Sequence, residues 1–156
     1  MTAVPTMVWD VVNSPSIEAR DLSALRGLGG GGAAAPPQLV RRLREVLPGR
    51  GAGTGYGMTE SSSLTTSIGG PDYVARPRSV GVPVPIVEVR IADHEGQVPV
   101  GESGEIWIKG PTVVAGYWRR PKETAETFVD GWLHSGDLGE FDDEGFLYIV
   151  DVPRTW

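Results

Sequence analysis

Glycine and proline recur along this sequence at intervals too short for most long helices. The chain has 22 glycines and 13 prolines among 156 residues, and both residue types disrupt helix interiors and favour turns. We therefore expect few long helices, and short strands should dominate the second half. With 40% hydrophobic and 22% charged residues, the chain can bury an ordinary globular core. The expected fold class is α+β, with a partial α/β layer followed by a small distorted β-barrel.

The charge balance and the residue inventory argue against several kinds of site. The formal net charge is −6, which does not favour nucleic acid as a partner. The absence of cysteine excludes disulfides, thiolate zinc sites and a cysteine nucleophile. No apolar stretch is long enough to cross a bilayer, and the first residues lack the pattern of a secretory signal. We therefore expect a cytoplasmic protein without a transmembrane segment.

The first residues predict a helix, a strand and a glycine loop. Residues 4–12 are mostly apolar and end shortly before Pro15, which indicates a short helix. Residues 25–28 predict a strand that enters the run Gly29–Ala33. Such a loop lets the backbone approach a ligand closely, because no Cβ stands in the way. A flexible linker explains the same glycine run at least as well.

The clearest helix signal lies in residues 36–47. Pro36 and Pro37 stand where a helix favours proline, and apolar residues follow at helical spacing with arginines on the opposite face. Pro48 ends this helix, and a short strand is expected near residues 51–54. Strand, loop, helix and strand together predict part of an α/β layer.

A polar segment follows that strand. Two glycines flank Tyr56, and Thr59 and Glu60 stand side by side after them. This grouping can stack a flat ring on Tyr56, bind a phosphate through Thr59 and place Glu60 on a Mg²⁺ ion that also holds phosphate oxygens. A polar turn rich in serine and threonine is the plainer alternative.

The second half predicts short strands with one brief helix. Pro121 opens one or two helical turns over residues 122–128. Trp118 and Trp132 are expected in the core, because an aromatic residue in a small barrel more often packs than reacts. The expected strands are separated by prolines or by glycine-rich turns and lie in residues 80–93, in residues 105–109, around Trp132, in residues 138–141 and in residues 146–150.

The segment 131–137 holds a further candidate for chemistry. Asp137 follows a glycine at a predicted strand edge, where an ionised carboxylate can accept two hydrogen bonds from a vicinal diol such as a ribose. An aspartate in this position can equally cap a turn. His134 is assigned no metal role, because His94 is the only other histidine and cysteine is absent.

Taken together, these segments resemble the adenylate-forming superfamily, and specifically its acyl-CoA synthetases, also called fatty-acid–CoA ligases. A single motif would be weak evidence, but here several occur in the family's order over nearly the whole chain. The motifs that carry the resemblance are Gly31-Gly32-Ala33, Gly55-Tyr56-Gly57-Met58-Thr59-Glu60, Gly101-Glu102-Ser103-Gly104-Glu105-Ile106, Gly116-Tyr117-Trp118, Gly131-Trp132 and Ser135-Gly136-Asp137.

The resemblance implies ATP-dependent activation of a carboxylic acid, with a fatty acid as the favoured substrate. An acyl-adenylate would form first, and the thiol of coenzyme A would then take the acyl group. The implied cofactors are ATP or AMP, Mg²⁺ and coenzyme A as co-substrate. The implied roles are a backbone wall beside adenine for Gly31, Gly32 and Ala33, adenine stacking for Tyr56, phosphate binding for Thr59, Mg²⁺ binding for Glu60 and ribose binding for Asp137, with Thr59 and Glu60 as the catalytic pair.

Two parts of the family pattern have no counterpart in this sequence. No serine-, threonine- and glycine-rich phosphate loop ending in lysine precedes Val4, and the small C-terminal domain with the adenylation lysine is absent. The resemblance thus implies only the C-terminal part of the large AMP-binding domain. Its expected divisions are the end of the α/β subdomain in 1–75, a β-barrel subdomain in 76–151 and an atypical tail in 152–156.

Two readings of the function follow from these matches and departures. The chain is either part of an acyl-CoA synthetase that is inactive by itself, or a non-catalytic remnant that binds adenosine or a partner. Strands whose neighbours are missing leave an open edge, so association through exposed strand edges is also expected.

Overall fold

The structure of this chain is a computed structural model that describes residues 1–32 and 35–151. Proline stands in the first turn of every α-helix in this part of the chain, where its missing N–H costs no hydrogen bond. The helices expected at residues 4–12, 36–47 and 122–128 are confirmed, whereas a fourth, α3, was not expected. The helices are α1 (Pro5–Val12), α2 (Pro37–Val46), α3 (Gly70–Ala75) and α4 (Pro121–Thr127), with a short 3₁₀ helix η1 (Thr59–Ser61).

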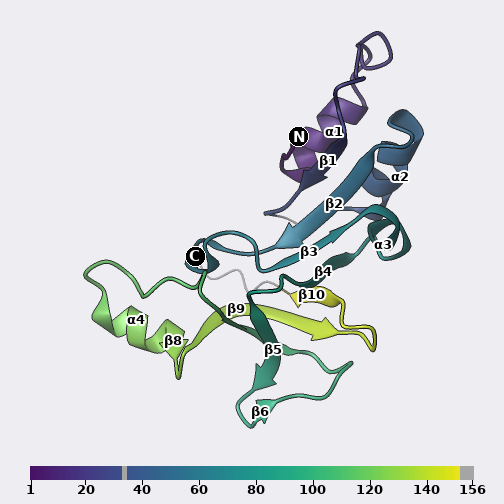
Figure 1. Ribbon diagram of the computed structural model, residues 1–156. Helices are drawn as coiled ribbons and strands as arrows, with labels where there is room; N and C mark the ends of the chain where they lie inside the picture. The colour runs from purple at the N-terminus through teal and green to yellow at the C-terminus, as the bar shows by residue number, and fades with distance from the viewer. Residues whose placement is uncertain (33–34, 152–156) are drawn as a thin grey trace.

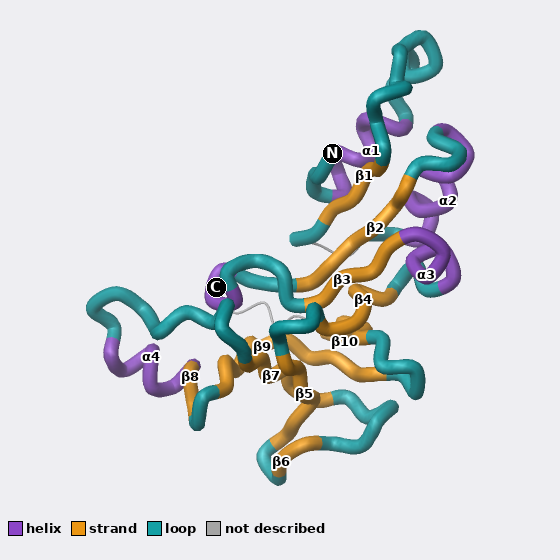
Figure 2. The backbone as a smooth tube through the Cα atoms, viewed as in Figure 1, coloured by secondary structure: helices purple, strands orange, loops and turns teal. Residues whose placement is uncertain are grey.

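All strands of the described residues belong to one 10-stranded sheet with the order β1-β2-β3-β4-β10-β9-β7-β5-β6, and β8 pairs with β9 beside this path. The β1–β2 pair is parallel, and the other pairs are antiparallel. Short strands joined by many loops dominate the second half, as expected (Figure 2). The strands are β1 (Gly27–Gly30), β2 (Gly51–Tyr56), β3 (Thr66–Gly69), β4 (Ser79–Pro83), β5 (Glu88–Asp93), β6 (Gly96–Gln97), β7 (Gly104–Lys109), β8 (Phe128–Val129), β9 (Trp132–Phe141) and β10 (Leu147–Asp151).

The α+β class is confirmed, but the sheet of the described residues does not close into a barrel. β1 and β6 stand at opposite ends of the strand order, without a pairing between them. The reason lies in β4, which pairs with β3 and also with β10. The strands of the second half therefore extend the sheet of the first half instead of closing on themselves. Figure 1 shows α1, α2 and α3 near β1–β3, while α4 and β8 lie at the far side of the molecule.

Two hydrophobic cores lie along this sheet. The first is built by α1, α2 and the neighbouring strands, with Leu28 and Leu39 among its buried residues. The second lies under β5, β7, β9 and β10, where Ile106, Ile108 and Leu133 are fully buried. Each core receives side chains from the other half of the sequence. Phe146 packs against the first core, and Tyr56 and Met58 pack against the second. These contacts link the two halves.

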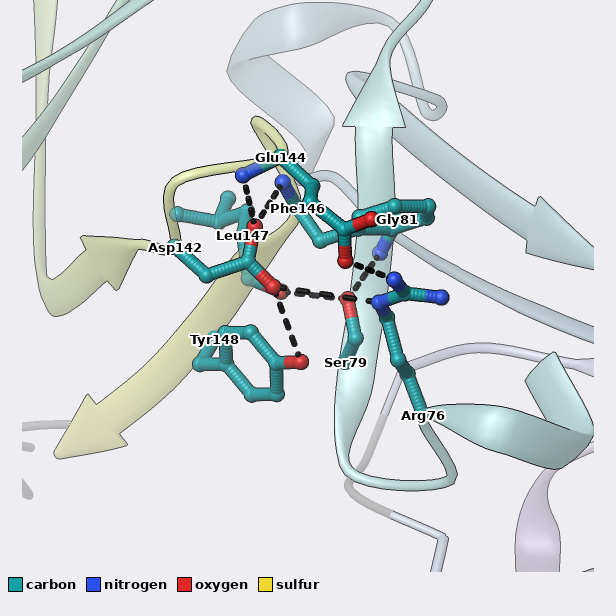
Figure 3. A network of polar contacts seen from close by, with 8 residues as sticks. All are labelled: Arg76, Ser79, Gly81, Asp142, Glu144, Phe146, Leu147 and Tyr148. Carbon is teal, nitrogen blue, oxygen red and sulfur yellow. Dashed lines mark hydrogen bonds and ion pairs between the residues drawn. The ribbon is translucent and has the colours of Figure 1, made fainter. Parts of the chain in front are cut away.

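A polar network links α3 and β4 to the hairpin between β9 and β10 (Figure 3). The buried Ser79 hydroxyl donates to the carbonyl oxygen of Leu147 at 2.9 Å and accepts from the N–H of Gly81 at 2.9 Å. Arg76 pairs with Asp142 at 3.8 Å and also with Glu144. These contacts support the β4–β10 pairing at the centre of the sheet.

The structure corrects two expectations for the second half. The strands expected around Trp132 and over residues 138–141 are one strand, β9, because Gly136 with φ +78° forms an irregularity within the strand and not a turn. Trp132 is 6% exposed, as expected for the core, but Trp118 is 85% exposed. Trp118 is exposed because it lies in the loop between β7 and α4, where Arg119 is the cation nearest its ring.

The outer edge of β1 is partly paired. The N–H of Ala3 donates to the carbonyl oxygen of Gly29 at 3.0 Å, and the N–H of Gly29 donates to the carbonyl oxygen of Met1 at 3.1 Å. Thr2 thereby forms a parallel bridge with Gly29. The first residues of the chain thus cover part of an edge that was expected to stand open. None of the helices in the described residues has the length and hydrophobicity needed to cross a membrane.

Candidate functional site

The main pocket of the described residues has a volume of about 580 Å³ and lies among segments that are far apart in the sequence. The loop after β1, the start of α2, the end of β2, the residues before β4 and the middle of β9 all contribute to its wall. Three of the predicted site residues, Gly32, Tyr56 and Asp137, meet there. The lining residues are Gly32, Ala35, Pro36, Pro37, Thr54, Gly55, Tyr56, Gly57, Tyr73, Pro77, Arg78, Ser79, Val80, Asp137 and Ile149.

Tyr56 and Asp137 are directly hydrogen-bonded in the wall of this pocket. The Tyr56 hydroxyl donates to Oδ2 of Asp137 at 2.7 Å. Burial raises the pKa of Tyr56 above its ordinary value, and the Asp137 carboxylate raises it further, while the Ser135 hydroxyl acts in the opposite direction. Tyr56 is therefore a neutral hydrogen-bond donor at physiological pH. The bond fixes both the aromatic ring and the carboxylate in the pocket wall.

The Asp137 side chain does not cap a turn in this structure. Its hydrogen-bond partner among the described side chains and backbone is Tyr56, whereas the backbone N–H of Asp137 donates to Oγ of Ser135 at 3.1 Å. Each carboxylate oxygen has two lone pairs, so one bond to Tyr56 leaves acceptor positions on both oxygens. The carboxylate can therefore still accept hydrogen bonds from a ligand in the pocket.

Thr59 and Glu60 lie beside the pocket and do not line it. Both belong to η1, which follows Gly57 by two residues. The Ser61 hydroxyl anchors this turn, since it accepts from the N–H of Met58 at 3.1 Å and from the hydroxyl of Thr65 at 3.0 Å. The site segment is thus an ordered turn with its own hydrogen bonds.

The glycine loop is placed next to the pocket as far as the structure describes it. Gly32 lines the pocket and has φ +78°, a conformation that favours glycine. A Cβ on Gly31 would lie 3.2 Å from the carbonyl oxygen of Gly55, which lines the pocket. Ala33, the third residue of the expected wall, lies outside the described residues.

The residues present fit a Mg²⁺ ion only together with phosphate ligands. The part of the chain that the structure describes contains no group of three or more side chains suited to hold a metal ion. Glu60 provides a single carboxylate near the pocket. Mg²⁺ commonly binds through one or two carboxylates together with substrate phosphates and water, so one carboxylate is sufficient for an ion that arrives with a nucleotide.

Three residues around this site had no role predicted from the sequence. Arg78 is the cation among the residues that line the pocket, and Tyr73 is a buried aromatic residue in its wall. Tyr117 donates a hydrogen bond to Oε1 of Glu60 at 2.8 Å. The motif Gly116-Tyr117-Trp118 drew attention to Tyr117 without a function, whereas no sequence pattern marked Arg78 or Tyr73.

Comparisons with known proteins identify relatives of this chain. A family model described as "AMP-binding enzyme" matches residues 1–118. A long-chain-fatty-acid–CoA ligase from Yersinia pestis is 40% identical over 156 residues, which is 99% of this chain and 27% of the relative. A feruloyl-CoA synthase from Amycolatopsis is 41% identical over 149 residues, which is 95% of this chain and 30% of the relative.

A solved structure shares both fold and sequence with the chain. The o-succinylbenzoate coenzyme A synthetase from Bacillus subtilis, in complex with ATP and a magnesium ion, matches with a TM-score of 0.85 and 34% identity. The match covers 97% of this chain and 31% of that one. The chain therefore spans less than a third of the length of each of these relatives.

Proposed function

Since this chain belongs to the AMP-binding enzyme family of adenylate-forming enzymes, we propose that it forms part of the nucleotide site of an acid–CoA ligase. In the first step of the proposed reaction, a carboxylate oxygen attacks the α-phosphorus of ATP and displaces pyrophosphate. In the second step, the thiol sulfur of coenzyme A attacks the acyl carbon, loses its proton and displaces AMP. The adenylate is needed because a free carboxylate is a poor electrophile.

The hydrogen bond between Tyr56 and Asp137 in the pocket wall is the observation that supports this proposal. It holds an aromatic ring and a carboxylate side by side. An aromatic face can stack on adenine, and a carboxylate can accept hydrogen bonds from the two hydroxyls of a ribose. Gly32 leaves room for the base beside Tyr56, because it has no side chain. We assign the adenosine part of the ligand to these three residues.

We assign the phosphate end of the nucleotide to Thr59 and Glu60. Thr59 is exposed at the start of η1, where its hydroxyl is available to a phosphate oxygen. Glu60 would hold the Mg²⁺ ion, which supplies positive charge to the phosphates as charge develops at the α-phosphorus. Gly57 lies between these residues and Tyr56, so one short segment of chain would follow the nucleotide from base to phosphate.

The acyl substrate that we propose is a fatty acid. Most of the pocket wall away from Asp137 is apolar, with several prolines and with Val80 and Ile149. Arg78 adds one positive charge to this wall, which favours a ligand with anionic groups such as a carboxylate or a phosphate.

Titration of the isotope-labelled chain with AMP tests the adenosine site. We expect the backbone resonances of Gly32, Tyr56 and Asp137 to shift at millimolar AMP. Only weak binding is expected, because a site that lacks part of its contacts loses affinity. In the Asp137→Ala variant these shifts should disappear, because the ribose loses its acceptor.

Asp143→Ala is the matched control for the charge change, because Asp143 is exposed in the β9–β10 turn and does not line the pocket. This control should bind AMP like the unaltered chain. Absence of shifts in the unaltered chain at millimolar AMP would contradict the proposal and favour the alternative, a non-catalytic remnant.

A further inference from the structure

Tyr117 and Glu60 are far apart in the sequence and meet next to the pocket. Tyr117 lies in the loop between β7 and α4, and its hydroxyl donates to Oε1 of Glu60 at 2.8 Å. Both side chains are half-buried. Among the described residues, no hydrogen bond or ion pair involves Oε2 of Glu60, so this oxygen is available to another partner.

The same loop also holds the main chain of Glu60. The N–H of Val114 donates to the carbonyl oxygen of Glu60 at 2.9 Å. Glu60 is thus fixed at its backbone by Val114 and at its carboxylate by Tyr117. Two bonds from one loop define both the position and the rotamer of this side chain.

Tyr117 is itself held in place by α4 and the strand after it. Its N–H donates to Oγ1 of Thr124 at 2.9 Å, and this hydroxyl donates to the carbonyl oxygen of Arg120 at 2.7 Å. The Tyr117 ring packs edge-on against Phe128, with ring centres 5.7 Å apart. A Cβ on Gly116 would lie 2.4 Å from Cγ2 of Thr124, so only glycine allows this close approach.

The phenol of Tyr117 is a stable donor. Burial raises its pKa, and the hydrogen bond to Glu60 raises it further. The hydroxyl donates its hydrogen bond to Oε1 of the Glu60 carboxylate at 2.8 Å.

We propose that Tyr117 is a positioning residue for the divalent cation that accompanies the nucleotide. Its hydroxyl occupies Oε1 of Glu60 and thereby leaves Oε2 directed to the metal as a single, pre-ordered ligand. Hydrogen bonds to metal-ligating carboxylates orient the ligand, and their loss commonly weakens metal affinity 10- to 100-fold. This inference rests on the proposed function, in which Glu60 holds Mg²⁺.

Comparison of AMP with Mg²⁺·ATP as ligands of the full chain tests the role of Tyr117. In Tyr117→Phe we expect the Kd for Mg²⁺·ATP to rise about tenfold or more, while the Kd for AMP stays unchanged. With Mn²⁺ in place of Mg²⁺, paramagnetic broadening of the Ser61 and Ser62 amide resonances should weaken in the same variant. In a Glu60→Gln background, Tyr117→Phe should add no further loss.

Tyr148→Phe is the matched control, because its hydroxyl also donates to a carboxylate, Oδ2 of Asp142 at 3.2 Å, but outside the site. This variant should bind both ligands like the unaltered chain. If Tyr117→Phe weakens the binding of AMP and of Mg²⁺·ATP equally, the bond to Glu60 has only a structural role and the proposal is overturned. Unchanged binding of both ligands would overturn it as well.

Binding measurements on the unaltered chain distinguish the role of Tyr117 from the proposed nucleotide site. If it binds AMP but Mn²⁺·ATP broadens no resonance near Glu60, the role of Tyr117 is overturned while the adenosine site stands. If it binds neither AMP nor Mg²⁺·ATP, the proposed function fails and the role of Tyr117 fails with it.

Discussion

Tyr56 and Asp137 stand 81 positions apart, yet a single hydrogen bond joins their side chains. The motif around each residue led to its prediction as a ligand-binding residue, and both residues line the same pocket. Neither motif predicted the contact, because β3, β4 and β10 lie between β2 and β9 in the sheet. Only the bending of the sheet across these strands brings the two residues together, and no local pattern encodes that bend. The contact between Tyr117 and Glu60 also escaped prediction, because it joins a loop to a 3₁₀ turn 57 positions away in the sequence.

Gly57 is a position where the size of one side chain controls the site. A Cβ at this position would lie 1.4 Å from the carbonyl oxygen of Ser63, so alanine forces the segment just after η1 to move. We expect Gly57→Ala to lower the free energy of unfolding by about 1–3 kcal/mol and to weaken AMP binding, because Tyr56 is its neighbour. Urea unfolding followed by tryptophan fluorescence measures the loss of stability.

Gly69→Ala is the matched control for this substitution. A Cβ there meets only the carbonyl oxygen of Ala52, at an ordinary 3.5 Å. The control should lose clearly less stability than Gly57→Ala and should keep AMP binding. Equal losses in the two variants would contradict the steric argument.

At the scale of elements, the pairing of β4 with β10 depends on one buried hydroxyl. Ser79 is 1% exposed and bridges the carbonyl oxygen of Leu147 to the N–H of Gly81 (Figure 3). Ser79→Ala leaves both backbone groups without this partner, so we expect a loss of about 1–3 kcal/mol in the free energy of unfolding. Ser67→Ala, at an exposed position of β3, should change it by less than about 0.5 kcal/mol. A similar result for the two variants in urea unfolding would be evidence against this role of Ser79.

The elements that the sequence predicted well are those with a local signal. Proline followed by helical spacing marked α2, and alternation marked β7. The helix α3 and the strand β3 are short and polar. Both were missed because contacts with neighbouring strands stabilise them, and their own sequence has no clear periodic pattern. Gly136 was expected at a strand edge, but it lies within β9, where its N–H donates to Oε1 of Glu105 at 2.9 Å.

For the molecule as a whole, we predict that the purified 156-residue chain forms no acyl-adenylate. Its two lysines are Lys109, which lies 5.4 Å above the ring of Trp132, and Lys122, which is near Glu126. Neither belongs to the family's phosphate loop or adenylation motif. Pyrophosphate release should therefore stay at background with ATP, Mg²⁺ and a fatty acid, while a full-length relative assayed in parallel provides the positive control. Release that depends on the fatty acid would contradict this prediction.

The division of the chain near residue 75 remains a proposal that the two hydrophobic cores support. The first core draws mainly on residues before α3 ends, and the second mainly on residues after β4 begins. Composition and motif order were enough to predict the α+β class and the family. They did not predict that one sheet runs through both parts, because that result depends on both edges of β4 being paired.

The place of β10 in the sheet has a consequence for how the chain is made. β10 pairs with β4 on one side and with β9 on the other, although it is the last of the strands that the structure describes. A ribosome releases the segments in chain order, so β1 to β4 emerge with one edge of β4 still open. That edge stays available to chaperones, or to a strand of a second nascent chain, until residue 151 has left the exit tunnel.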